Sequence, residues 1–139
     1  MIRKTPRPLA AIVLLLASLV LAACAGSQPK TPDVEARAQA KWDAHIAGDL
    51  GAVYEFLSPA RKSSINSLAY QRSLLRRQIG YTGAEVVGSD CLEDSCKVTI
   101  LIDIKVVRPV PGMDVYEGSQ EITENWVRTD GEWWFVPEK

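Results

Sequence analysis

The sequence predicts an α+β domain in which three N-terminal helices pack on a four-stranded antiparallel sheet. Two observations predict this class. Between residue 33 and Gly80 the apolar residues recur every three to four positions, as on one face of a helix, whereas after Gly80 they alternate with polar residues, as in a strand. Turn-forming residues such as Pro109, Gly112 and Gly131 then separate the strands. Helices followed by strands in this way favour an α+β arrangement.

Residues 1–23 have the pattern of a signal peptide. A basic start is followed by 15 apolar residues, 9–23. As a helix this run would be roughly 22 Å long, which is shorter than the roughly 30 Å hydrocarbon core of a bilayer. The run ends in Leu21-Ala22-Ala23-Cys24, which resembles the lipobox of bacterial lipoproteins.

This resemblance implies that Cys24 is lipidated and that the chain is cut before it. A cysteine suits the modification because its thiolate is a good nucleophile. Ala25, rather than an aspartate, follows Cys24, a pattern that implies an outer-membrane lipoprotein facing the periplasm. An ordinary secretory signal and an uncleaved anchor remain alternatives. Acyl chains contribute about 0.8 kcal/mol for each buried CH₂, so we expect a permanent lipid anchor.

The rest of the chain divides into a tether and one domain. Residues 24–32 comprise Cys24 and a small, polar, proline-containing segment, which predicts a flexible tether. Residues 33–139 are long enough for a single core. Without residues 1–23 the chain has 13 basic and 17 acidic residues, whereas a nucleic-acid binder has a basic excess. We therefore expect no nucleic-acid partner.

Three helices are expected before Gly80. Asp33 is the predicted cap of the first, and Gly48 its end. Asp49 is the predicted cap of the second, which ends near Pro59, and the third is expected over residues 63–78. The first helix has a stripe of apolar side chains that should face the core: Val34, Ala38, Trp42 and Ile46.

Four strands are expected after Gly80, over residues 84–91, 96–107, 116–128 and 133–136. The second places five apolar β-branched residues on one face, which are Val98, Ile100, Ile102, Ile104 and Val106. In the third strand Ile122 and Trp126 should turn inward, and the strand alternation then turns Gln120 and Glu124 inward as well.

Cys91 and Cys96 lie on either side of a predicted four-residue loop, where cross-strand partners are close enough for a disulfide. Three cysteines minus a lipidated one leave an even number, and an exported protein is in an oxidising compartment. We therefore predict a Cys91–Cys96 disulfide. A zinc site and a redox-active pair are the alternatives, but zinc needs four ligands and His45 is the single histidine.

Glu124 is the most informative polar residue, because a carboxylate in a core must be paired or must line a wet pocket. Arg72 interrupts the apolar stripe of the third helix and is its candidate partner. The hypothesis is that Glu124 and Arg72 mark the polar end of an internal cavity. The alternative is an exposed Glu124 at the sheet edge, with Arg72 extending from the helix margin into solvent.

No other constellation predicts a reaction. Asp43 and His45 are two residues apart on a helix and so point to different sides. The acidic residues Asp90, Glu93 and Asp94 surround a turn, where solvation explains them better than calcium. We expect no catalytic residues, no cofactor and no metal.

Two stretches, WDAHIAGDLGAVYEFLSPARK (42–62) and DGEWWFV (130–136), together with the element order, resemble the nuclear transport factor 2-like superfamily. The resemblance implies a cone in which helices and a bent sheet enclose a pocket, and it leaves a homodimer through the outer sheet face open. It implies that Trp42, Tyr54 and Trp134 are structural residues of the cone. With the residues considered above, the predicted pocket consists of Trp42, Tyr54, Arg72, Glu124, Trp126 and Trp134.

Two functions from different classes follow. The first is a non-enzymatic, membrane-anchored periplasmic domain that binds an envelope protein or a small apolar ligand, as an accessory of an envelope assembly. The alternative is a small isomerase or dehydratase that uses a carboxylate inside the cone, Glu124 or Asp103. A fold alone does not establish an activity.

Overall fold

The computed structural model describes residues 33–138. The expected signal peptide, the lipidation site Cys24 and the tether lie outside these residues. Within the described part of the chain, no helix is both long and apolar enough to cross a membrane. The elements are, in order, α2 (Val34–Ile46), α3 (Leu50–Glu55), α4 (Pro59–Lys62), α5 (Ser67–Leu75), β1 (Gly80–Leu92), β2 (Ser95–Val107), β3 (Val115–Thr129) and β4 (Glu132–Val136).

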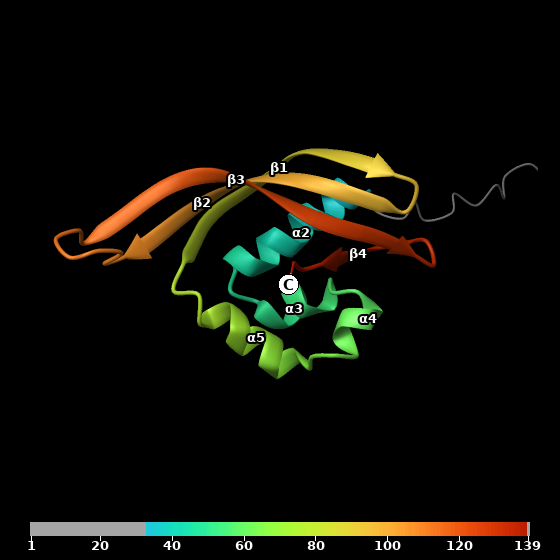
Figure 1. Ribbon diagram of the computed structural model, residues 1–139, viewed down its shortest axis with the longest axis horizontal. Helices are drawn as coiled ribbons and strands as arrows, with labels where there is room; N and C mark the ends of the chain where they lie inside the picture. Colours follow the sequence, from blue (N-terminus) through green and yellow to red (C-terminus); the bar gives the residue numbers. More distant parts are fainter. Residues whose placement is uncertain (1–32, 139) are drawn as a thin grey trace, which may run out of the picture. The chain divides into compact units, whose positions relative to one another are not determined.

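The domain has an α+β fold with one four-stranded antiparallel sheet, which confirms the predicted class. The strand order is β1-β2-β3-β4, so each strand pairs with its neighbour in the sequence. Figure 1 shows the sheet curving over the helices, with α2 directly beneath it and α3, α4 and α5 farther from it. After β4 the chain runs from the sheet toward α3.

The helical half contains four helices among the described residues, so the prediction of three is wrong. An additional short helix, α4, forms before the helix expected over residues 63–78, and that expected helix is shorter, beginning only at Ser67 as α5. Ser58 caps α4, with Pro59 in its first turn, and Asn66 accepts a hydrogen bond from the backbone N–H of Ala69 at 2.9 Å to begin α5. Each cap satisfies N–H groups that a continuous helix would have bonded internally.

The caps of the first two helices differ from each other. Asp33 occupies the N-cap position of α2, but its side chain makes no capping hydrogen bond, so that part of the prediction is wrong. Asp49 caps α3 as predicted, and its Oδ1 accepts a hydrogen bond from Ala52 N at 2.9 Å. The left-handed Gly48 (φ +76°) turns the chain between the two helices.

The core lies between α2 and the concave face of the sheet. Val98 and Ile100 of β2 and Trp126 of β3 have no exposed surface, and Ala38 of α2 packs against them. Burying one such aliphatic side chain stabilises the fold by about 1.5–3 kcal/mol. The predicted inward face of β2 and the inward direction of Glu124 and Trp126 in β3 are therefore confirmed, whereas Gln120, expected inward, and Ile46, expected to face the core from the first helix, are exposed. A second, smaller cluster joins α3 to α5 through Val53, Leu57 and Tyr70.

Tight turns connect β1 to β2 and β3 to β4. Asp130 and Gly131 both have positive φ angles, 53° and 81°, which is the two-residue hairpin geometry that favours Gly at its second position. The turn between β1 and β2 is also shorter than predicted, because Leu92 pairs with Ser95 and two residues remain between them.

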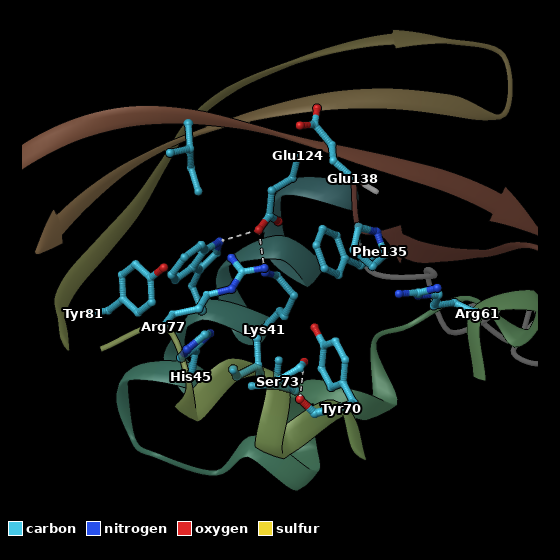
Figure 2. Close-up of a pocket in the computed structure, with 15 residues that line it drawn as sticks. Lys41, His45, Arg61, Tyr70, Ser73, Arg77, Tyr81, Glu124, Phe135 and Glu138 are labelled. Carbon is cyan, nitrogen blue, oxygen red and sulfur yellow. Dashed lines mark hydrogen bonds and ion pairs between the residues drawn. The ribbon is translucent and has the colours of Figure 1, made fainter. Parts of the chain in front are cut away.

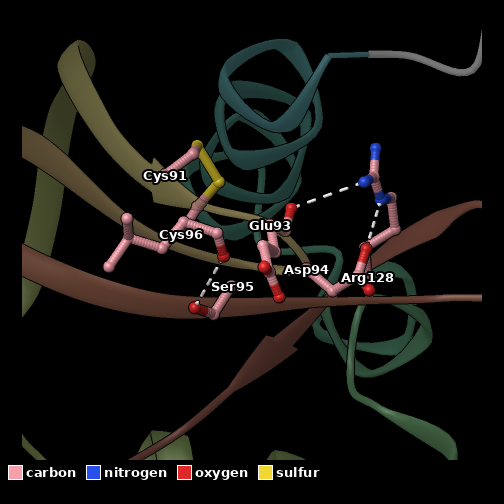
Figure 3. Close-up of polar contacts among 7 residues, drawn as sticks. Cys91, Glu93, Asp94, Ser95, Cys96 and Arg128 are labelled. Carbon is pink, nitrogen blue, oxygen red and sulfur yellow. Dashed lines mark hydrogen bonds and ion pairs between the residues drawn. A yellow bond between two sulfur atoms is a disulfide. The ribbon is translucent and has the colours of Figure 1, made fainter.

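Cys91 and Cys96 are directly opposite each other on β1 and β2 and are joined by a disulfide, with Cα atoms 4.0 Å apart (Figure 3). The adjacent turn is held to β3 by Arg128, whose Nε donates to Asp94 Oδ1 at 2.9 Å. Its Nη2 also donates to the carbonyl of Glu93 at 3.4 Å. The acidic turn thus has the guanidinium of Arg128 as its positive partner.

The side chain of Gln39 in α2 is bonded to the backbone of the edge strand β1. Gln39 Nε2 donates to the carbonyl of Ala84 at 3.0 Å, and Gln39 Oε1 accepts from Val86 N at 2.9 Å. The side-chain amide of Gln39 therefore makes the two hydrogen bonds that a neighbouring strand would make to the backbone of β1. These bonds lie beside the register shift that follows Val86. An edge strand otherwise presents such groups to other chains.

Replacing Gln39 with alanine is expected to lower the free energy of unfolding by about 1–2 kcal/mol, because two backbone groups of β1 lose their partner. Urea unfolding monitored by tryptophan fluorescence measures this change. Gln71→Ala is the matched control, because Gln71 also lies in a helix but bonds only to Ser67 one turn away. Equal stability of the two variants would contradict the proposed role of Gln39.

Candidate functional site

A cavity of about 180 Å³ lies between the helices α2 and α5 and the strands β1, β3 and β4. Figure 2 shows side chains from these elements converging on it. Its polar and charged lining consists of Lys41, His45, Arg61, Tyr70, Ser73, Arg77, Tyr81, Glu124 and Glu138. Its apolar lining consists of Trp42, Val53, Leu74, Ile122, Phe135 and Pro137.

Glu124 of β3 is the centre of the polar wall, and both of its carboxylate oxygens accept hydrogen bonds. Oε1 accepts from Lys41 Nζ at 2.6 Å and from Trp42 Nε1 at 3.1 Å (Figure 2). Oε2 accepts from Trp126 Nε1 at 3.3 Å. Glu124 is 7% exposed and Lys41 3% exposed, so this is a buried ion pair supported by two indole N–H groups.

The ammonium of Lys41 is also enclosed by aromatic rings. Its Nζ lies 4.5 Å from the ring centre of Trp42 and 4.3 Å from that of Phe135. Burial lowers the pKa of Lys41 from 10.5, and the nearby carboxylate of Glu124 opposes that change. A buried charge is costly unless it is paired, so Lys41 and Glu124 each depend on the other.

His45 lies one helical turn after Lys41 on the same face of α2. Its ring stacks on Trp42, with centroids 5.3 Å apart, and meets Tyr81 edge to face at 4.9 Å. Burial, together with the positive charges of Lys41 and Arg77, lowers the pKa of His45 to about 4. The imidazole is therefore neutral at pH 7.

This pKa predicts a loss of stability in mild acid. The unfolded chain takes up a proton on His45 below pH 6.5, whereas the folded domain does so only near pH 4. The free energy of unfolding should therefore fall as the pH drops from 6.5 to 4. The full difference would be about 3 kcal/mol for a buried group, and solvent screening at this partly exposed ring reduces our expectation to about 1–2 kcal/mol.

Urea unfolding at several pH values between 7 and 4 measures this dependence. His45→Phe, which retains a ring against Trp42, should lose stability less steeply than the wild type over the same interval. Identical slopes for the two proteins would show that His45 is not the titrating group.

Tyr70 of α5 faces the cavity from the opposite side to Glu124. Its hydroxyl points into the cavity in Figure 2 and has no hydrogen-bond partner within residues 33–138. Burial, followed by the negative charge of Glu124, raises the pKa of Tyr70 to about 12. At neutral pH the hydroxyl is therefore protonated and can donate a hydrogen bond.

Of the predicted pocket residues, Trp42 and Glu124 line the cavity, and Trp126 contacts Glu124 from the core. The predicted Arg72–Glu124 pair is wrong, because Arg72 is exposed and lies with Ala69, Leu75 and Arg76 around a separate surface hollow. The α2 helix, not α5, packs on the sheet, and so a residue of α2 supplies the cation.

Tyr54 and Trp134 were also predicted to line the pocket, and neither does. The hydroxyl of Tyr54 donates to the carbonyl of Ile65 at 3.0 Å, which joins α3 to the chain before α5. The guanidinium carbon of Arg37 lies 5.0 Å from the ring centre of Trp134. Both are packing residues outside the cavity.

Lys41, Tyr70 and Arg77 line the cavity although the sequence did not predict them there. A signal for Lys41 existed, because it falls three residues after Ala38 and seven after Val34, within the apolar stripe of α2. Lys41 thus interrupts the apolar stripe of its helix in the same way as Arg72 does. Arg77 follows the end of α5, and its direction depends on a turn that has no simple pattern.

No protein-family model matches the chain, and no curated protein matches it. The fold is similar to the solution structure of a SEC-C motif containing protein from Rhodopseudomonas palustris, with a TM-score of 0.56 and 16% sequence identity. The similarity covers 75% of this chain and 75% of that chain. At this identity the likeness concerns the fold alone.

Proposed function

We propose that this chain is a lipid-anchored protein of the bacterial cell envelope whose domain binds a small ligand without catalysis. The observation that carries the binding role is the cavity wall at Glu124. All three donors around this carboxylate belong to the protein, and they hold both oxygens in place. A general base needs a free acceptor position to take the substrate's proton, and protein donors already occupy three of the roughly four positions of this carboxylate, so this arrangement favours binding over acid–base chemistry.

The second carboxylate considered for an enzyme, Asp103, does not line the cavity. Its Oδ1 accepts a hydrogen bond from Ser119 at 2.5 Å, and both side chains are exposed. Among residues 33–138, the cavity is lined by two carboxylates, Glu124 and the exposed Glu138. An enzyme would therefore have no second buried carboxylate in this cavity.

The proposed anchor rests on the sequence Leu21-Ala22-Ala23-Cys24. We also propose that the domain has the cone-like architecture of the nuclear transport factor 2-like superfamily. A curved sheet over helices, with a cavity between them, is consistent with such a cone. Periplasmic localisation at the outer membrane follows from Ala25 and is part of the proposal.

Small molecules that copurify with the full-length protein test the binding role. The protein is purified from its native membrane, denatured in methanol, and the supernatant is compared by mass spectrometry with that of Ser73→Trp, in which an indole fills the cavity. A compound recovered only with the wild type would support the proposal. Identical supernatants from the two proteins would count against it.

A further inference from the structure

The polar groups of the cavity are unevenly satisfied. Three protein donors occupy three of the roughly four acceptor positions of Glu124. In contrast, Arg77 has no carboxylate within 4.0 Å and Tyr70 no hydroxyl partner among residues 33–138. The cavity thus offers donors to a ligand, and a complementary ligand must bring acceptors.

The charges around the cavity leave one positive charge uncompensated. Lys41 and Glu124 form a pair, and the exposed Arg61 and Glu138 at the rim are opposite in sign. His45 is neutral at pH 7. Arg77, which is exposed like Arg61 and Glu138, is the remaining charge of the lining, so a ligand with one negative charge matches the site.

The end of α5 directs Arg77 toward the cavity. The helix ends at Leu75, Arg77 N donates to the carbonyl of Leu74 at 3.2 Å, and Gln78 takes a left-handed conformation with φ 53°. In Figure 2 the guanidinium extends over the cavity. It acts electrostatically on both His45 and Tyr70, which line the same space.

The rest of the wall limits the ligand to a small, partly apolar molecule. The volume of about 180 Å³ is small for a ligand pocket, which typically has about 300–1,000 Å³. Trp42, Ile122 and Phe135 provide apolar surface beside the donors. This combination disfavours inorganic phosphate, which has no apolar part, and long acyl chains, which are too large.

We propose that the cavity binds a small organic monocarboxylate, whose oxygens accept hydrogen bonds from Arg77 and Tyr70 and whose apolar end lies against Trp42 and Phe135. A guanidinium suits this role because its N–H groups match the two oxygens of a carboxylate. The inference rests on the proposed function, since it names the ligand class of the same cavity.

The test is a titration of the full-length protein in detergent micelles, followed through the indole N–H resonance of Trp42. The probes are butyrate, butan-1-ol and butylammonium, which share an alkyl chain and differ in charge. Butyrate should shift the resonance saturably and bind at least about tenfold more tightly than butan-1-ol, because charged hydrogen bonds contribute about 1.5–3 kcal/mol.

Arg77→Gln should weaken butyrate binding about tenfold, whereas Arg76→Gln, next to it but outside this cavity, should leave it unchanged. Tyr70→Phe provides an independent variant, and it should weaken butyrate but not butan-1-ol. Unchanged butyrate binding by both Arg77→Gln and Tyr70→Phe would overturn the carboxylate site, as would equal binding of butyrate and butan-1-ol by the wild type. If no probe shifts the resonance, the cavity takes no small ligand and the proposed function fails as well.

Discussion

Replacing Glu124 with leucine is expected to lower the free energy of unfolding by about 3–5 kcal/mol. The change leaves Lys41 buried without a counter-ion, and it removes the acceptor of the Trp42 and Trp126 indoles. Lys41 is 3% exposed, so water in the adjoining cavity can replace the lost carboxylate only in part. Urea unfolding, followed by far-ultraviolet circular dichroism, measures the effect.

Two further variants separate the buried pair from other consequences of the change. Glu121→Leu removes a carboxylate from the same strand, but Glu121 is exposed, so its effect should be within about 0.5 kcal/mol. Adding Lys41→Met to Glu124→Leu should recover much of the lost stability, because a hydrophobic pair replaces a lone charge. Additive losses in the double variant would show that the two residues do not stabilise each other.

Replacing Cys24 with alanine is expected to move the protein from the detergent phase to the aqueous phase in a Triton X-114 partition of cell extracts. The proposed acyl chains are attached through this sulfur, and without them the mature chain has no lipid. The wild-type protein should carry acyl mass on an N-terminal Cys24 by intact mass spectrometry.

The double variant Cys91→Ala/Cys96→Ala is the matched control, because it removes the disulfide thiols and retains Cys24. It should remain in the detergent phase. A wild-type protein whose mature N-terminus lacks acyl mass, or that retains its leader, would contradict the lipoprotein proposal.

The arrangement of strands could be predicted because alternation on a sheet is a local property. The inward face of β2 and the inward direction of Glu124 both follow from a period of two residues. The short helix α4 and the late start of α5 could not be predicted from apolar spacing, because they depend on the side-chain caps Ser58 and Asn66, respectively.

The partner of Glu124 could not be chosen from the sequence alone. Lys41 and Arg72 both interrupt apolar stripes, and only the packing of helices decides which stripe meets the sheet. Lys41 and Trp42 are 83 and 82 positions before Glu124 in the sequence, respectively, and tertiary structure that no local pattern encodes brings them to this carboxylate. The inward carboxylate was therefore predictable, and its donors were not.

The indole N–H resonances of the four tryptophans test the central claim, that protein donors fix Glu124 at the cavity wall. In a ¹H–¹⁵N spectrum, Glu124→Gln should move the resonances of Trp42 and Trp126, whose Nε1 atoms donate to this carboxylate. Those of Trp133 and Trp134 should stay in place. A spectrum in which Trp42 and Trp126 keep their wild-type positions would contradict the account.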